Sequence, residues 1–289
     1  MQPTVIVDFS WIYHRAYHTF ASLTFPSEGK LIKTGSMYGV IRDLSSLRKR
    51  FDKVKVAIEP KKNDKRYELV SEYKAGRKRP DDLYDLYQET IYAASCIPGV
   101  SVITSEESGE ADDVIYSYIK VQGQEGYYDS WDVFYIFGND KDLLQIVSED
   151  WLRNRVFFFH LKNDEAVRFE HHIEKSFGVD PEGVLFFRSV VGDSSDNIAS
   201  VVPRFPRKKL REFAKYETPS EFQNRFRCDS ELSKDKHARL LIENYGKWKI
   251  NYKIMKLQNL PIVEVKAPIG KDSNYFVKKY GMRSLRRFR

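Results

Sequence analysis

The sequence predicts an α/β fold, with a central, mostly parallel sheet flanked by helices and a smaller, mainly helical region after it. From residue 4 to about 180, short β-branched or aromatic runs alternate with stretches of helical periodicity. After residues 178–181, which read Gly-Val-Asp-Pro, the strand signals fade. With 289 residues and 42% hydrophobic content, the chain can form one large domain or two of ordinary size. We predict an α/β domain over residues 1–180 and a helical domain over residues 181–289.

Individual elements follow from local patterns. Strands are expected where Val, Ile, Phe or Tyr cluster, near residues 4–9, 54–59, 100–104, 132–137 and 155–160. In the first region, apolar residues recur at helical spacing near 36–51, 81–95, 111–121 and 141–147. In the second region the same spacing predicts helices near 182–191, 206–216, 219–226 and 233–257.

Composition narrows the class of protein. The sequence contains no apolar run of about 18 residues, so no membrane span is expected. The N-terminus enters a strand without the basic and apolar regions of a signal peptide. Cys96 and Cys228 are far apart and in no ligand spacing, as expected for reduced thiols. These features predict a cytoplasmic protein, and a monomer is the default expectation.

Charge is divided unevenly along the chain. Residues 200–289 hold 23 Lys and Arg against 9 Asp and Glu, a net charge of +14, whereas the whole chain carries +7. Positions 1–199 are therefore net acidic. A strongly basic half is typical of a surface that binds a polyanion, although a basic run can also only solubilise a face.

Residues 61–80, called the arch segment below, interrupt the alternation of strands and helices. They contain eight basic and three acidic residues, with tyrosines between them. This composition fits an element that follows phosphates and stacks on bases. An exposed, mobile connection has the same composition, so both interpretations stay open.

Acidic residues follow the predicted strands. The carboxyl ends of parallel strands meet at one edge of a sheet, so residues far apart in sequence can converge there. Two further acids lie three residues apart at the junction with the helical region. Singly, each acid could cap a helix or form a turn. Together they form one set: Asp8, Glu59, Glu110, Asp112, Asp113, Asp140, Asp142, Asp193 and Asp196.

Nine clustered carboxylates would repel one another unless cations were present. Hard ions such as Mg²⁺ prefer carboxylate and water ligands, and no Cys or His pattern competes for them. Two such ions roughly 4 Å apart can clamp the attacking water and the leaving oxygen in phosphodiester hydrolysis. The acids and the basic surroundings therefore predict a metal-dependent nuclease that uses two Mg²⁺ ions, for which Mn²⁺ can substitute.

Five motifs follow one another along the chain: Val7-Asp8 with Arg15-Ala16-Tyr17-His18, Tyr73-Lys74 with Arg77 and Pro80-Asp81-Asp82-Leu83, Glu110-Ala111-Asp112-Asp113-Val114, Asp140-Lys141-Asp142-Leu143, and Gly192-Asp193-Ser194-Ser195-Asp196-Asn197-Ile198. In this order they resemble the 5′-nuclease family of flap endonucleases, the 5′→3′ exonuclease domain of bacterial DNA polymerase I and free-standing phage enzymes. The resemblance covers about the first 210 residues and is closest to the phage ribonuclease H that removes RNA primers. It implies a PIN-like nuclease domain and a role in DNA replication or repair.

The resemblance also implies roles by position. Asp8, Glu59, Glu110 and Asp112, with Asp113 beside them, would hold or orient the first metal. The acids Asp140, Asp142, Asp193 and Asp196 would serve the second, some through water. Lys74 would stabilise charge on the scissile phosphate with help from Arg77, and Arg15 would contact the strand near the cleavage point. The basic Arg79 lies in the same arch segment, beside or through which a 5′ single strand would pass.

The sequence departs from the family pattern in three places. Glu59 stands where the family usually has Asp. The Gly-x-Gly hairpin that cradles duplex phosphates and often a potassium ion is missing, which puts the K⁺ site in doubt. Two prolines at 203 and 206 remove backbone donors there, so DNA contacts are expected from Arg204, Arg207, Lys208 and Lys209. No polymerase domain follows, so the chain is expected to be free-standing.

The sequence thus predicts a structure-specific 5′-nuclease that acts on flaps, nicks or RNA primers and leaves a 5′-phosphate. A PIN-type endoribonuclease and an inactive branched-DNA-binding protein are the alternatives, and only the second is suggested by Glu59. Met282, Leu285 and Phe288 are spaced like a peptide that docks on a sliding clamp, although a basic tail that adds to DNA binding fits them better. A single-strand-binding protein is a further possible partner.

Overall fold

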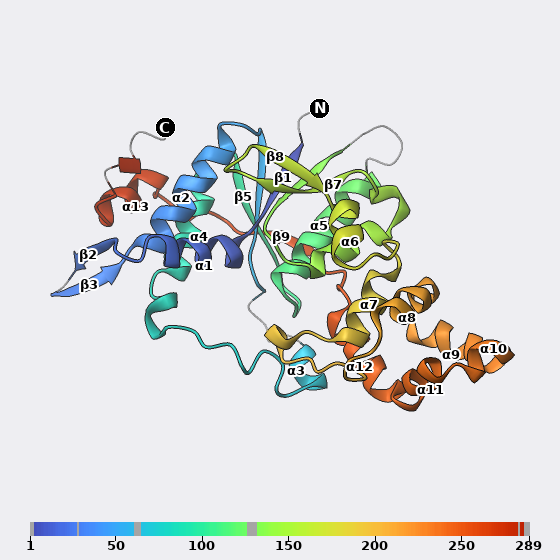
Figure 1. Ribbon diagram of the computed structural model, residues 1–289. Coiled ribbons are helices and arrows are strands. Elements are labelled where there is room, and N and C mark those ends of the chain that lie inside the picture. Colours follow the sequence, from blue (N-terminus) through green and yellow to red (C-terminus); the bar gives the residue numbers. More distant parts are fainter. Residues whose placement is uncertain (1–2, 28, 61–64, 126–131, 283, 286–289) are drawn as a thin grey trace.

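The computed structural model describes residues 3–27, 29–60, 65–125, 132–282 and 284–285. Within them, the central sheet has seven strands in the order β8-β7-β6-β1-β4-β5-β9 (Figure 1). Five strands are parallel and correspond to the five predicted ones, which confirms those predictions. They are β1 (Thr4–Asp8), β4 (Lys53–Ala57), β5 (Val100–Ser105), β6 (Phe134–Phe137) and β7 (Val156–His160). The edges are closed by antiparallel β8 (Glu165–Arg168) and β9 (Ile262–Glu264).

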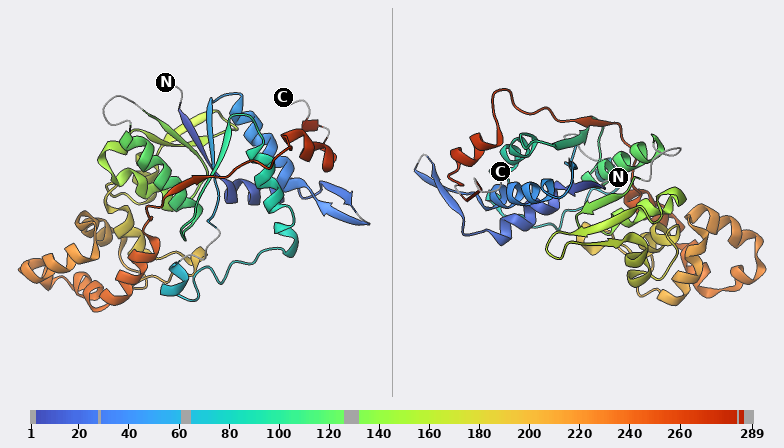
Figure 2. Two further views of the ribbon diagram at one scale, coloured as in Figure 1. Left: turned by 180° about the vertical axis from the view of Figure 1, so that it is seen from behind. Right: turned by 90° about the horizontal axis from the view of Figure 1, so that it is seen from above.

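Helices cover both faces of the sheet, and alternate residues of β1 belong to different apolar clusters. Val5 and Val7 pack with α1 (Phe9–Thr19), α2 (Gly35–Arg48) and α4 (Tyr87–Ser95). Ile6 packs on the other face with α5 (Ala111–Glu125) and α6 (Phe169–Ser176). Figures 1 and 2 show these layers on either side of the strands. The mostly parallel α/β sheet predicted from the sequence is therefore confirmed.

The helical region continues the apolar cluster of the α5 face: Phe186 and Trp248 pack against each other and belong to the same cluster as Phe134 of β6. Short 3₁₀ helices η2 (Asp142–Ser148), η3 (Asp150–Leu152), η4 (Ser194–Asp196) and η5 (Ala214–Tyr216) connect the longer elements. The expected helix over 233–257 is broken where Asp235 accepts hydrogen bonds from the amides of His237 and Ala238 and so starts a new helix. The helices are α7 (Gly183–Val191), α8 (Arg207–Phe213), α9 (Pro219–Cys228), α10 (Ser230–Lys234), α11 (Lys236–Glu243) and α12 (Tyr245–Met255).

Several elements were not predicted. Helix α1 begins directly after β1, without a connecting loop, because Asp8 ends the strand and caps the helix through the Trp11 amide. The hairpin of β2 (Thr24–Ser27) and β3 (Lys30–Lys33), and α3 (Arg66–Leu69), are too short for a clear periodicity. The expected helix over 81–95 is a 3₁₀ helix, η1 (Asp81–Tyr84), followed by α4, and the one over 141–147 is the 3₁₀ helix η2.

The chain after α12 leaves the mainly helical region that was predicted over residues 181–289 and returns to the sheet. Strand β9 pairs with β5, and α13 (Ser273–Lys279) returns to α4, where Lys279 bonds Glu89 at 2.9 Å. Met282 and Leu285 are buried in the apolar cluster of the α1–α2 face. This burial does not present them to a clamp, and Phe288 lies outside the described residues. No helix in the described ranges is long and apolar enough to cross a membrane.

Candidate metal centre and nucleic-acid interface

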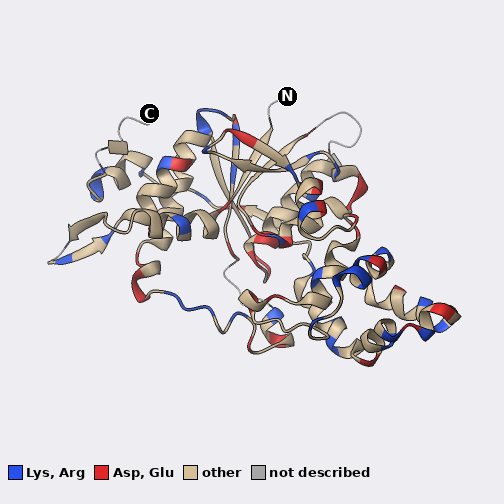
Figure 3. Ribbon diagram, in the orientation of Figure 1, with Lys and Arg blue, Asp and Glu red and all other residues tan. Residues whose placement is uncertain are grey.

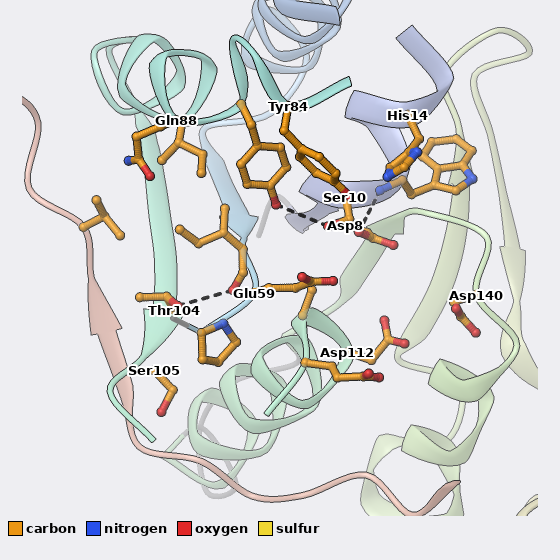
Figure 4. Close-up of a pocket in the computed structure, with 18 of the residues that line it drawn as sticks. Asp8, Ser10, His14, Glu59, Tyr84, Gln88, Thr104, Ser105, Asp112 and Asp140 are labelled. Atoms are coloured by element: carbon orange, nitrogen blue, oxygen red, sulfur yellow. Dashed lines mark hydrogen bonds between the residues drawn. The ribbon is translucent and has the colours of Figure 1, made fainter. Parts of the chain in front are cut away.

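Carboxylates from four parts of the chain meet at the carboxyl ends of the central strands. Asp8 ends β1, Glu59 follows β4, Asp112 lies in the first turn of α5, and Asp140 follows β6. All four line one cavity of about 1160 Å³. Figure 4 shows their side chains around this pocket, with His14 and Tyr84 on a neighbouring wall. The convergence expected from the strand order is present for these residues.

Three of the acids approach one another closely enough to share an ion. One carboxylate oxygen from each of Asp112, Asp140 and Asp142 lies within 4.8 Å of the other two. The Asp140 side chain accepts a hydrogen bond from the Asp142 amide at 2.8 Å, which fixes the turn after β6. The donor set consists of oxygens, as a hard divalent cation requires.

The carboxylates resist ionisation in the absence of a cation. Burial, with Asp140 and Glu59 nearby, raises the pKa of Asp8 to about 7. Burial also raises the pKa of Asp142 to about 7, although Arg188 opposes the shift. The pKa of Asp112 is raised well above its ordinary value by burial and by the surrounding acids. A cation held among these groups would replace the protons, so the site fits a divalent metal ion.

Arg188 of α7 was not predicted as a site residue. It is buried, and its Nη2 lies 2.6 Å from Asp142 Oδ1 and 3.0 Å from Asp193 Oδ2. It therefore joins the acid that follows β6 to the acid that follows α7. Its position within the apolar sequence Val-Leu-Phe-Phe-Arg-Ser-Val-Val was the available signal, because a charge on a buried helix face needs a partner.

The last two acids lie in a tight turn after α7. Gly192 has φ 77°, and a Cβ there would lie 2.4 Å from the Ile198 carbonyl oxygen, so the turn requires glycine. Asp193 caps η4 by accepting from the Ser195 amide at 2.8 Å. Burial opposes ionisation of Asp193, but hydrogen bonds from Ser195 and Arg188 hold its pKa below the ordinary value.

The described part of the arch segment reaches the acids directly. The Lys74 ammonium forms an ion pair with Glu110 and lies 4.0 Å from Asp196 Oδ2. Arg77 also pairs with Asp196. The Tyr73 hydroxyl lies 3.2 Å from Glu110 Oε1 and 3.3 Å from Asp196 Oδ2. The structure thus brings Lys74 and Arg77 to Glu110 and Asp196.

Asp113 is not brought to the cluster. Its carboxylate is fully buried and pairs with Arg66 of α3, at 2.6 Å and 3.0 Å. This placement does not support the metal role predicted for Asp113. Because Arg66 is buried in this pair, it is not among the basic residues of the arch segment that could bind phosphates.

The residues predicted to contact nucleic acid differ in whether they are exposed or already paired within the protein. Arg15 pairs with Asp43 of α2 and lies over the Trp11 ring, 4.3 Å from its centroid, so it is engaged within the fold. Lys209 bonds Glu212 at 3.1 Å and Asp235 at 2.9 Å. Lys74 and Arg77 are paired with Glu110 and Asp196. The other predicted contacts are exposed, namely Arg79, Arg204, Arg207 and Lys208. Figure 3 shows basic stretches along the arch segment and on α8, and acidic stretches at the start of α5.

Known proteins similar to this chain include 5′-3′ exonucleases. The family model of the 5′-3′ exonuclease N-terminal resolvase-like domain matches residues 3–178. The chain is 28% identical to the 5′-3′ exonuclease of Buchnera aphidicola subsp. Acyrthosiphon pisum over 205 residues, covering 69% of this chain and 65% of that protein. Identity to DNA polymerase I of Pseudomonas aeruginosa is 34% over 203 residues, or 69% of this chain and 20% of the polymerase. The chain thus covers just under two thirds of the Buchnera exonuclease and a fifth of the polymerase.

Solved structures share the fold. The T5 D15 protein crystallised with metal ions has a TM-score of 0.65 at 17% identity, covering 89% of this chain and 90% of that one. The catalytic core of Rad2 in complex with DNA substrate has a TM-score of 0.54 at 13% identity, covering 100% of this chain and 93% of that one. Because the family model matches more than half of the sequence and the fold agrees with it, the chain belongs to the 5′-3′ exonuclease family.

Proposed function

We propose that this protein is a Mg²⁺-dependent, structure-specific 5′-nuclease. It hydrolyses phosphodiesters near the 5′ ends of flaps, nicks or RNA primers, as a flap endonuclease or 5′→3′ exonuclease. The observation that carries the proposal is that Lys74 and Arg77 line the same pocket as a group of carboxylates, namely Asp8, Glu59, Glu110, Asp112 and Asp140. A phosphodiester needs cations on its charged oxygens, and this pocket offers fixed cations beside a site for metal ions.

The acids divide into two groups in this proposal. Asp8, Glu59, Glu110 and Asp112 would hold or orient one Mg²⁺ ion, and Asp140, Asp142, Asp193 and Asp196 would serve a second. When bound, the ions would activate a water and neutralise charge on the phosphate. The chain itself positions these ligands: Arg188 holds Asp142 and Asp193, and the Trp11 amide holds Asp8 at 3.0 Å.

Lys74 has the central role among the cationic residues. Its side chain is largely buried, and burial opposes its charge, but Glu110 and Asp196 raise the pKa of its ammonium group, so it stays charged. A charged ammonium at the edge of the acids can contact a scissile phosphate and stabilise the charge that develops there. Arg77 is placed to assist from the same segment.

We propose that the substrate is DNA, which the protein would contact through its phosphates. The T5 D15 flap endonuclease has been solved in a pseudo-enzyme-product complex with DNA and metal ions, and the Rad2 core in complex with DNA substrate. In this chain, the exposed Arg79 guanidinium lies 5.5 Å from the Tyr84 ring centroid at the pocket wall. Arg204, Arg207 and Lys208 add an exposed basic surface at the start of α8. These groups would contact phosphates through side chains, which predicts steep salt dependence.

A labelled 5′-flapped duplex in Mg²⁺ tests the proposal. Wild type should release the flap and leave a 5′-phosphate, and Asp112→Asn, Asp140→Asn and Lys74→Ala should each lower the single-turnover rate at least about 100-fold. Exposed Lys30, on the β2–β3 hairpin away from the pocket lining, supplies the matched control Lys30→Ala, which should cleave normally. Unchanged rates in all three site variants would refute the assignment. Preference for single-stranded RNA would favour a PIN-type endoribonuclease, and tight flap binding without turnover in Mg²⁺ or Mn²⁺ would favour an inactive binding protein.

A further inference from the structure

Asp113 and Asp112 are neighbours in sequence, yet they serve different parts of the molecule. Successive residues of a helix point about 100° apart, so only one of the two can face the metal site. Asp112 lines the pocket, whereas Asp113 is 0% exposed and points into the protein. The Asp113 carboxylate accepts hydrogen bonds from the backbone amides of Glu110, at 2.9 Å, and Gln258, at 2.7 Å. Both of its oxygens are also paired with Arg66.

Arg66 makes the complementary connections. It is 3% exposed, and its Nε donates to the Ile254 carbonyl at 2.6 Å. Its Nη2 donates to the Lys256 carbonyl at 3.2 Å as well as to Asp113 at 3.0 Å. A single guanidinium thus joins α3 of the arch segment, the start of α5 and the end of α12.

This junction bears on the site from both sides. At the start of α5, Asp113 bonds the amide of Glu110, so it fixes the turn that carries Glu110 and Asp112. On the arch side, Arg66 anchors the chain eight residues before Lys74, and the buried Tyr73 is hydrogen-bonded to Glu110. An anchor outside the pocket thus connects the segment that bears Lys74 with the turn that bears Glu110 and Asp112.

We propose that Arg66 and Asp113 are a positioning pair for the nuclease reaction, and that Asp113 is not a metal ligand. The pair holds the Lys74 side of the arch segment against the helix that bears Glu110 and Asp112. The inference rests on the proposed function for its effect on cleavage, but not for its effects on metal binding and on the order of the arch segment.

A double-mutant cycle of Arg66→Met and Asp113→Asn tests the pair, with Asp112→Asn as the matched carboxylate control. Asparagine at 113 keeps an oxygen for the Glu110 amide but loses the charge that holds Arg66. Mn²⁺ affinity, measured by calorimetry, should stay within about threefold of wild type in Asp113→Asn and fall at least about tenfold in Asp112→Asn. The single-turnover cleavage rate should fall at least about tenfold in Arg66→Met and in Asp113→Asn. The double variant should lose little more than the worse single variant, because the two residues act through one contact.

Control variants separate a positioning role from a general loss of stability. Leu241→Ala removes a fully buried side chain in α11, at the far end of the helical region from α3 (Figure 1), and should lower Tm without a comparable rate loss. Arg66→Lys, which keeps the charge but not the two-pronged geometry, should recover part of the rate. Arg50→Met, which breaks an exposed pair with Asp164, should leave rate and metal affinity unchanged.

Two results would overturn the inference. One is a loss of Mn²⁺ affinity in Asp113→Asn as large as that in Asp112→Asn, which would make Asp113 a ligand. The other is a rate loss no greater than in Leu241→Ala at matched Tm. If wild type does not cleave the flap, the proposed function fails. Amide hydrogen exchange of residues 65–80 then tests whether Arg66 and Asp113 still hold this segment in place. Arg66→Met should then speed exchange there at least about tenfold, and unchanged exchange would refute the positioning role.

Discussion

The protonation of the carboxylates predicts how stability depends on pH when metal is removed. Asp8 and Asp142 have pKa values of about 7 in the folded protein, against an ordinary value of 3.8. Below about pH 4 both groups are protonated in the folded and unfolded states. As the pH rises from about 4 to about 7, the unfolded chain releases these protons and the folded chain retains them. The folded state then binds more protons than the unfolded state, so stability falls with rising pH.

The size of the loss in stability follows from how far the pKa values of Asp8 and Asp142 are raised. Within this pH range, a rise of one pH unit lowers the free energy of unfolding by about 1.4 kcal/mol for each of the two carboxyl groups. Between about pH 5.5 and about pH 7, each carboxyl therefore removes about 2 kcal/mol of the free energy of unfolding. For a chain of this size, about 4 kcal/mol from the two corresponds to a fall in Tm of about 8 °C.

Thermal melts in EDTA, followed by circular dichroism across this pH range, measure the effect. The Asp8→Asn/Asp142→Asn variant isolates it, because His14 contributes the opposite slope: burial and nearby Arg79 lower its pKa. Saturating Mg²⁺ should abolish or reverse the fall in wild type, since the ion favours the ionised carboxylates. A wild-type Tm in EDTA that changes with pH as it does in the double variant would refute the assignment of these protons.

Three further outcomes are expected. Gly138→Ala should weaken Mn²⁺ binding several-fold in calorimetry, because the new Cβ would lie 3.2 Å from the Asp8 Cβ and push that side chain; an unchanged affinity would contradict this. Arg188→Met should lower Tm and raise the pKa of Asp142 in carboxylate NMR titrations, because it removes the cation that opposes the shift; a pKa that stays in place would count against it. Met282→Ala should lower the free energy of unfolding by about 2–3 kcal/mol in urea melts, since its side chain is 5% exposed, whereas a freely docking tail would show no loss.

Much of the fold could be predicted because each parallel strand is a short run of β-branched or aromatic residues. Val5 to Val7 and Phe134 to Phe137 are recognisable without any partner. Strand β9 was missed because it is only three residues long, Ile262–Glu264, and it follows a helical stretch far along the chain from its partner β5. Helix α1 was missed because Asp8 ends a strand and caps a helix at the same residue, leaving no loop to mark the change.

The acidic residues, like the strands, could be predicted in part: their positions after the strands are visible in the sequence, but the direction in which each one faces is not. The convergence of these carboxylates could be predicted because a parallel sheet brings those strand ends to one edge. Which of these acids face the pocket depends on packing between distant segments. Asp112 and Asp113 look equivalent in sequence, but Arg66, far from them along the chain, provides a buried countercharge for Asp113 alone. A buried charge requires a partner, and the partner is chosen by packing between distant segments rather than by local sequence.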